Sequence, residues 1–405
     1  MENCVSIPLL IMKRGFCMKP IRTFIQQNLI KATIEVEKVI HKATNGKLAG
    51  NCFLSAIDIP KVGTKVKIIK ETDDATYIAK FKDDGTIDNG DFKILATTDL
   101  HFCPDNDLNN KTLQKMVNQI RDEKPDLVIF TGDNILGRFQ QIEAVQFAQM
   151  MEKIGVYWVY VFGNHEARDE KEYYKYLIFK SICDYPHCLS KFGDPSLFGF
   201  GNFLVNIMNS ETELKQSLVF FDSGRDMVDS HRKIDGVPDD LPEGYDYIKK
   251  SQIDWYEKEI KSLKETYGKV ESMLYMHIPI KEYEEVFYRN EEGKFVPTGK
   301  AEILYGRMFE SVGSSPYNSG LFEAMKRNGS QAIFCGHDHV NDWAAKYEGI
   351  LLVYNQYGSY GAYNLGDYNG MHLDEKDWQQ GVTITTIHPD GSIDLRQSFH
   401  AKYLK

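Results

Sequence analysis

Five short groups of residue types that bind metal ions recur at wide intervals along the chain. Each supplies carboxylate, amide or imidazole side chains, and most include a glycine. Oxygen and nitrogen donors of this kind suit hard or borderline divalent cations, and two such ions held together can cleave a P–O bond at neutral pH. In chain order the groups are Asp99-Leu100-His101, Gly132-Asp133-Asn134, Gly163-Asn164-His165-Glu166, His277 and Gly336-His337-Asp338-His339.

The side chains divide into ligands for two ions. Asp133 is the natural bridge, because a carboxylate has two oxygens. His337 and His339 can serve different ions, since alternate residues of an extended segment point to opposite sides. We assign one ion to Asp99, His101, Asp133 and His339, and the other to Asp133, Asn164, His277 and His337.

His165 is left over and is predicted to be catalytic. It directly follows Asn164, so the two side chains cannot easily face the same ion. We expect His165 to protonate the leaving oxygen or to stabilise charge on the phosphoryl group, while a metal-bound hydroxide attacks phosphorus in line. Arg138 is a weaker candidate for binding the phosphate. Glu166 and Asp338 are expected to support the ligands or to face solvent.

The groups differ in how specific they are. Asp-x-His and Gly-Asp-Asn are each common in ordinary turns, and a lone histidine such as His277 is usually structural. Gly-His-Asp-His is far more specific, because loops seldom carry two close histidines without a metal. The prediction therefore depends on the complete set in this order.

Apolar runs of strand length end just before each group. They cover residues 94–98, 127–130, 156–162, 273–276 and 332–335. Helical spacing of apolar residues lies between several of them, as at Leu113, Met116, Val117 and Ile120. Apolar strands that alternate with helices predict an α/β fold whose sheet is covered by helices. Ligands of such sheets bind at the carboxyl ends of the strands, which is where all five groups fall.

The chain divides into two parts in this interpretation. Residues 1–75 form an N-terminal region of uncertain structure, and residues 76–405 form the domain that carries the groups. Within that domain, residues from about 281 to 318 are charged, rich in tyrosine and without clear periodicity. We expect them to be an irregular, lid-like insertion over the site.

Composition limits the partners and the compartment. The 405 residues include 48 Lys and Arg against 58 Asp and Glu, a net charge of −10. This acidic balance argues against nucleic acid, whereas a phosphorylated small molecule or phosphoprotein remains a suitable substrate, because bound metal ions carry their own positive charge. No apolar stretch approaches the roughly 20 residues of a membrane span.

The cysteines and the N-terminal segment bear on localisation. Seven scattered cysteines without a Cys-x-x-Cys pair favour a reduced compartment, and we expect a cytoplasmic protein. Residues 3–34 are basic and contain no acidic residue. They are either an amphipathic helix packed on the body or a targeting segment, which leaves organelle targeting open.

At these residues the chain resembles the calcineurin-like metallophosphoesterase superfamily. That family's pattern is Asp-x-His, Gly-Asp, Gly-Asn-His-(Asp/Glu), His and Gly-His-x-His, and every position is present between about residues 90 and 345. The resemblance implies a metallophosphoesterase domain, with a two-sheet β-sandwich flanked by helices. It also implies two divalent or mixed-valence metal ions (Fe, Mn or Zn).

Within the superfamily, the chain is most similar to the small purple-acid-phosphatase-like branch, which includes a fungal cell-cycle-regulator phosphatase. Residues 125–134, 251–256, 318–320 and 335–342 carry this similarity. True purple acid phosphatases place a metal-binding tyrosine where this chain has Leu136, and the signatures of serine/threonine protein phosphatases are absent.

These observations predict a metal-dependent phosphoric ester hydrolase that acts on phosphomonoesters. A phosphodiesterase with the same metal site is the alternative, because the same ligands serve both reactions. A metal-binding scaffold without catalysis is a third reading.

Overall fold

The computed structural model describes residues 57–103, 107–137, 140–166, 172–366, 368 and 373–403. The chain divides into two units, residues 1–52 and residues 53–405. The first unit, which contains the whole basic N-terminal segment of residues 3–34, lies outside the described residues. In the second unit, β1 (Val66–Glu71) pairs antiparallel with β2 (Ala75–Lys80). Strand β1 thus lies before residue 75, at which we predict the N-terminal region to end.

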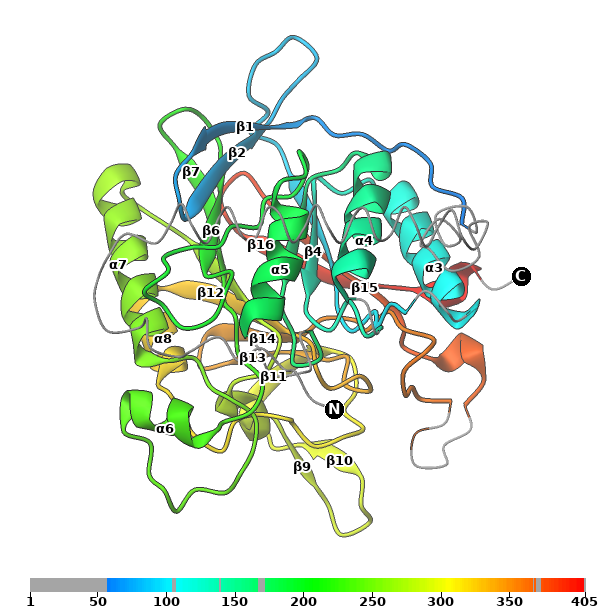
Figure 1. Cartoon of the computed structure of the whole chain (residues 1–405), viewed down its shortest axis with the longest axis vertical. Coiled ribbons are helices and arrows are strands. Elements are labelled where there is room, and N and C mark those ends of the chain that lie inside the picture. The colour runs from blue at the N-terminus through cyan, green and yellow to red at the C-terminus, as the bar shows by residue number, and fades with distance from the viewer. Residues whose placement is uncertain are drawn as a thin grey trace, which may run out of the picture. The chain divides into compact units, whose positions relative to one another are not determined.

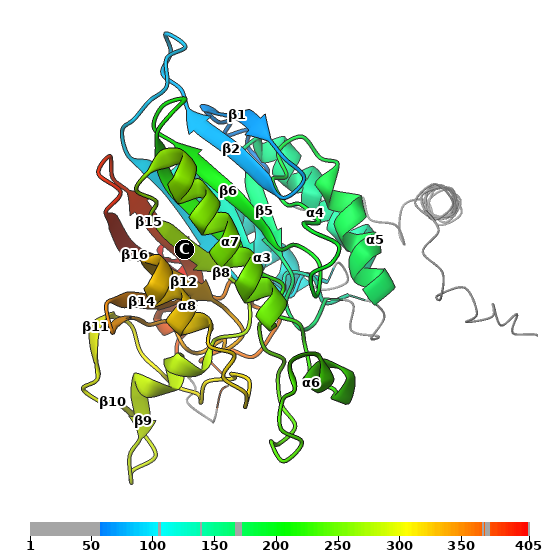
Figure 2. The ribbon, with the colours of Figure 1, turned by 90° about the vertical axis from the view of Figure 1, so that its left-hand side faces the viewer.

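One large sheet contains nine strands (Figures 1 and 2). Beside β1 and β2, the order is β6 (Phe203–Met208), β7 (Leu214–Phe220), β8 (Ser272–Tyr275), β12 (Ser330–Cys335), β14 (Ile350–Tyr354), β13 (Ala344–Tyr347) and β11 (Ala301–Tyr305). The four central strands, β7, β8, β12 and β14, run parallel, and β11 closes one edge against β13.

The second sheet contains five strands. Its order is β16 (Ile393–Phe399), β15 (Gly381–Ile387), β3 (Phe92–Thr97), β4 (Leu127–Thr131) and β5 (Trp158–Val161). Strands β3, β4 and β5 are parallel, as their apolar sequences predict. The helices α3 (Asp107–Glu123), α4 (Gln140–Ile154) and α5 (Glu172–Cys183) lie beside these strands (Figure 1).

The two sheets pack face to face because strands of the large sheet bury both faces. On β8, Met273 and Tyr275 join the core shared with the five-stranded sheet. Leu274, between them, joins the core under α7 (Lys250–Tyr267) and α8 (Leu321–Asn328). This alternation confirms the predicted α/β fold, a two-sheet sandwich flanked by helices.

An aromatic ladder crosses four strands in the space between the sheets. Phe203, Phe220, Tyr275 and Phe334 stack in sequence, with ring centroids 4.8, 5.4 and 4.6 Å apart. All four side chains are buried. Their strands include β8 and β12, so the ladder fixes the two strands from which His277, His337 and His339 follow.

The segment 281–318 is more regular than expected. It begins with the 3₁₀ helix Lys281–Glu285, followed by a hairpin of β9 (Phe287–Arg289) and β10 (Phe295–Pro297). Strand β11 then joins the edge of the large sheet. The expectation of an irregular segment is thus corrected for these residues, since pairing with β13 supplies the hydrogen bonds that periodicity did not reveal.

Candidate metal centre

The predicted groups meet where strands of both sheets end. Asp99, Asp133 and Asn164 follow β3, β4 and β5, whereas His277 and His337 follow β8 and β12. Backbone hydrogen bonds tie neighbouring loops together, as between the Asp99 amide and the Gly132 carbonyl at 3.0 Å. The His337 amide donates to Asp99 Oδ2 at 2.9 Å and so joins the two sheets at this point.

Six of the predicted ligands form two groups of three. Within each group, donor atoms of the three side chains lie within 4.8 Å of one another. His101 Nε2 and His339 Nε2 lie 3.6 and 3.3 Å from Asp99 Oδ1. The first group is Asp99, His101 and His339, and the second is Asp133, His277 and His337.

Asp133 lies between the two groups. Its Oδ2 atom is 3.3 Å from His277 Nε2 and 3.9 Å from His101 Nε2. Asn164 Oδ1 is 3.0 Å from His277 Nε2, on the side of the second group. All seven predicted ligands are therefore close together, and Asp133 Oδ2 lies within 4 Å of histidines of both groups.

His165 faces the same space and is more exposed. Its Nε2 lies 3.7 Å from Asp133 Oδ2, and its side chain is 35% exposed against 1% for Asp133. The His165 amide donates to Asp133 Oδ1 at 2.7 Å, which leaves Oδ2 turned toward the histidines. Burial lowers the pKa of the His165 imidazole, although Asp133 acts in the opposite direction. Arg138, the weaker candidate, lies outside the described residues.

Four predicted ligands have a left-handed backbone conformation. The φ angles are 53° at Asp99, 47° at His101, 49° at Asp133 and 78° at His337. Among the described residues, six that are not glycine have a positive φ, and these are four of them. Such conformations are strained for L-amino acids and gather at functional sites.

Gly132 shows why these turns need glycine. Its φ is 97°, and an added Cβ would lie 2.5 Å from His277 Nδ1. The close approach of His277 to this turn allows a hydrogen bond, in which the neighbouring carbonyl of Thr131 accepts from His277 Nδ1 at 2.8 Å. That bond directs the other nitrogen, Nε2, toward Asp133 and Asn164.

The buried carboxylates and imidazoles of the site interact strongly with one another. Burial alone would raise the pKa of Asp99, but the imidazoles of His277 and His339 hold it well below its usual range. Burial would likewise lower the pKa of His277, whereas Asp133 and Asp99 raise it to about 10. Asp99 Oδ1 is buried without a hydrogen-bond partner, close to three imidazole nitrogens. Two carboxylates, an amide and four imidazoles fit a pair of divalent ions.

Glu166 supports the ligands from behind, as expected for a residue that does not itself bind metal. Its buried carboxylate accepts hydrogen bonds from the amides of Asp133 at 3.0 Å and Gly163 at 2.8 Å, and from the hydroxyl of Tyr160 at 2.8 Å. The Asn134 amide donates to it at 2.6 Å. One side chain thus fixes the loops that carry Asp133 and Asn164.

A second support was not predicted. Residues 307–313, here called the bracing loop, run along the segment that follows His337. Amides of this loop donate to Asp338 from Gly313 at 3.0 Å and to Asp342 from Arg307 at 2.7 Å. The Phe309 amide donates to Asn341 at 3.0 Å. The run of Asp and Asn after the histidine pair was the available signal, since these side chains often accept from backbone amides.

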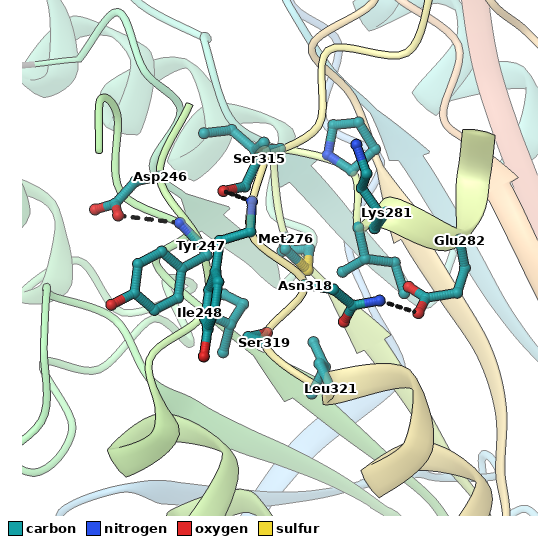
Figure 3. Close-up of a pocket in the computed structure, with 14 residues that line it drawn as sticks. Asp246, Tyr247, Ile248, Met276, Lys281, Glu282, Ser315, Asn318, Ser319 and Leu321 are labelled. Atoms are coloured by element: carbon teal, nitrogen blue, oxygen red, sulfur yellow. Dashed lines mark hydrogen bonds between the residues drawn. The ribbon is translucent and has the colours of Figure 1, made fainter. Parts of the chain in front are cut away.

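A small pocket adjoins the centre but does not share its donors (Figure 3). Its walls come from residues 246–248, 276, 278–282, 315, 317–319 and 321. Asn318 donates a hydrogen bond to Glu282 within it at 2.8 Å. Met276 and Ile278 line the pocket on either side of His277 in the chain, but no predicted ligand does.

Comparison with known proteins gives the family. The family model described as calcineurin-like phosphoesterase matches residues 92–341, which is more than half of the chain. The chain belongs to the calcineurin-like phosphoesterase family. Members of this family use a dinuclear metal centre. The two donor groups found here are candidates for the two metal positions of such a centre.

Relatives in the family confirm the predicted branch. The "Probable inactive purple acid phosphatase 29" of Arabidopsis thaliana is 31% identical over 314 residues, covering 68% of this chain and 74% of that protein. The "Phosphatase DCR2" of Saccharomyces cerevisiae is 32% identical over 282 residues, covering 64% of this chain and 46% of that protein. A solved dimetal phosphatase from Danio rerio has a TM-score of 0.46 and 13% identity, over 76% of this chain and 96% of that one.

Leu136 is the residue at which we expected a true purple acid phosphatase to carry a metal-binding tyrosine. Its amide donates to the Phe102 carbonyl at 2.9 Å. Within the described residues, no helix combines the length and the apolar character needed to cross a membrane.

Proposed function

We propose that this protein is a dinuclear-metal phosphohydrolase that cleaves phosphomonoesters. The observation that carries the proposal is the position of Asp133 Oδ2, within 4 Å of histidines from both donor groups. A single carboxylate between two buried sets of donors is what an ion pair needs. Asp99, His101, Asp133 and His339 would hold one ion, and Asp133, Asn164, His277 and His337 the other.

The protein's own residues prepare the site for the reaction. When bound, two divalent ions supply a nucleophile from water at neutral pH and positive charge for the phosphoryl oxygens. The Thr131 carbonyl fixes His277 with Nε2 toward the ions. Glu166 fixes the amide of Asp133, so that this carboxylate does not need to reorganise during the reaction.

His165 is proposed to act on the substrate. The imidazoles of His101, His165 and His277 all lie within 4 Å of Asp133, and His165 is the most exposed of the three. It also belongs to neither donor group. A ring N–H here could donate to a phosphoryl oxygen or to the leaving oxygen. This role agrees with its place directly after Asn164.

The preference for monoesters is supported by the branch. DCR2 of yeast is named a phosphatase, and the chain shares 32% identity with it. The bracing loop also contacts His337 closely, since a Cβ at Gly313 would lie 2.7 Å from that ring. Because the bracing loop packs this closely on His337, it leaves less room beside the second donor group for the second ester substituent that a phosphodiester carries. A phosphorylated small molecule or a phosphoprotein would be the substrate.

A scaffold that binds metal without catalysis is the second candidate. The word "inactive" in the name of the Arabidopsis relative favours it. Against it stands His165, because an imidazole that belongs to neither donor group has no role in a site that only binds metal.

The test compares two esters on the metal-loaded full chain. With Mn²⁺ or Fe²⁺ added, p-nitrophenyl phosphate should be cleaved faster than bis(p-nitrophenyl) phosphate, and elemental analysis should find two ions per chain. The reverse ranking would favour the phosphodiesterase. Two bound ions without cleavage of either ester would favour the scaffold.

A further inference from the structure

One residue, Tyr363, makes several different contacts with His339. The ring of Tyr363 stacks on its imidazole, with centroids 4.1 Å apart and planes 6° from parallel. His339 Nδ1 lies 3.2 Å from the Tyr363 carbonyl oxygen, and the His339 amide donates to the Tyr363 hydroxyl at 3.3 Å. Side chain, carbonyl and hydroxyl of one residue thus all contact the same histidine.

Glu310 holds Tyr363 in turn. The Tyr363 hydroxyl donates to the Glu310 carboxylate, whose two oxygens both lie 3.0 Å away. The same carboxylate accepts from the amide of Val340, next to His339, at 3.0 Å. Glu310 belongs to the bracing loop, and its own amide donates to Asn341 at 3.2 Å. Three segments far apart in sequence therefore meet at this carboxylate.

The other histidines of the centre are held differently. His277 relies on the Thr131 carbonyl at 2.8 Å. His101 Nδ1 is buried and lacks a hydrogen-bond partner within the described part of the chain. Tyr357 also stacks on His339, but at a larger centroid distance of 5.8 Å. In the first donor group, His339 is thus the imidazole that neighbouring residues orient, and Tyr363 makes the closer ring contact and the hydrogen bonds.

We propose that Glu310 and Tyr363 are positioning residues that set the affinity of the first donor group for its ion. This inference rests on the proposed function, because it takes that group to be an ion site. The Tyr363 carbonyl accepts from Nδ1, which leaves the Nε2 lone pair for the ion. The stacked ring blocks rotation of the imidazole, and Glu310 holds that ring in place.

Substitution of Tyr363 or Glu310 is expected to weaken metal binding at the first donor group and not at the second. Removing an outer partner of a metal-bound histidine changes metal affinity by about 10–100-fold. Tyr363→Phe loses only the hydrogen bonds of the hydroxyl and keeps the ring and carbonyl. We expect it to weaken one of two Mn²⁺ binding events by about tenfold and leave the other unchanged. Glu310→Gln, which removes the charge, should weaken the same event.

The experiment is a calorimetric Mn²⁺ titration of the metal-free full chain. Urea unfolding of the metal-free variants separates positioning from stability, and should give wild-type midpoints. Tyr288→Phe is the matched control, because Tyr288 lies in β9 and is 53% exposed. It should bind both ions as the wild type does.

The outcomes distinguish this inference from the proposed function. If Tyr363→Phe and Glu310→Gln bind two Mn²⁺ ions with wild-type affinities, the inference is overturned while hydrolysis can still hold. Equal weakening of both events, together with a lower urea midpoint, would show a merely structural role and also overturn it. If the wild type binds two ions and cleaves no ester, the proposed function fails and the positioning role stands.

Discussion

His101 Nε2 and His339 Nε2 lie 3.0 Å apart, although they follow strands of different sheets. Two imidazole lone pairs repel at this distance unless a proton or a cation lies between them. Asp99 Oδ1 lies 3.3 Å from His339 Nε2 and 3.6 Å from His101 Nε2. The three atoms converge on one point, which supports the first ion position of the proposed centre.

The proposed bridge can be tested at Asp133. Asp133→Ala removes the carboxylate between the donor groups, so we expect loss of both ions and of turnover. Inductively coupled plasma analysis of the purified variant measures the ions directly. Asp254→Ala, which changes an exposed side chain of helix α7, is the control and should keep two ions per chain. Retention of both ions by Asp133→Ala would contradict a bridge.

His165 should separate catalysis from metal binding. We expect His165→Ala to keep both ions and to lower kcat by about 10²–10⁴-fold, because general acid–base groups contribute on that scale. His388→Ala is a control of similar side-chain exposure, 31% against 35%, in the β15–β16 hairpin. A kcat unchanged by His165→Ala would remove this residue from the mechanism.

Gly313 tests the contact between the bracing loop and the centre. A Cβ there would lie 2.7 Å from the His337 ring and 2.8 Å from Asp338 Oδ1, and both groups are buried and held in place. We expect Gly313→Ala to displace His337 and to reduce bound metal from two ions to about one. Ser314→Ala, the neighbouring substitution, should keep two. Full occupancy in Gly313→Ala would mean that the loop moves aside freely.

Glu123, which lies outside the metal centre, predicts how the stability of the fold depends on pH. Burial would raise the pKa of its carboxyl, but hydrogen bonds from Arg396 and Ser398 lower it from 4.5 to about 2. A carboxyl whose pKa is depressed in the folded state stabilises the fold above its unfolded pKa. That contribution is lost as the pH falls from about 4.5 toward 2.

The measurement for Glu123 is urea unfolding of the metal-free protein at pH 7, 5 and 3. Glu123→Gln should lower the free energy of unfolding by about 1–2 kcal/mol at pH 7. This is less than the full pKa shift would give, because solvent screens the interaction with the partly exposed Arg396. The difference from wild type should fall to less than half by pH 3. Glu265→Gln, on the exposed side of α7, should match wild type. A Glu123→Gln difference independent of pH would contradict the assignment.

Much of the fold and the centre could be predicted because local sequence encodes them. The apolar runs before Asp99, Asp133 and His277 are strands buried on both faces, so their pattern is visible without a partner. The donor groups follow them directly, and their residue types indicate metal binding before any geometry is known. The branch was likewise predicted from motifs.

The supports of the centre could not be predicted in the same way. Tyr363 belongs to no motif, and its relation to His339 arises only when a loop beyond β14 folds back over the site. The bracing loop and β11 are predicted to be irregular, because the hydrogen bonds of the loop go to side chains and β11 pairs only with β13, at the edge of the sheet. Such bonds depend on tertiary register, which local periodicity does not contain.

The left-handed turns at Asp99, His101, Asp133 and His337 have a consequence for protein engineering. In these residues the main chain aims the side chain, so copying the seven donors onto another sandwich would point several of them the wrong way. A transplant would need the whole loops, with Gly132 included, before it could be expected to chelate anything.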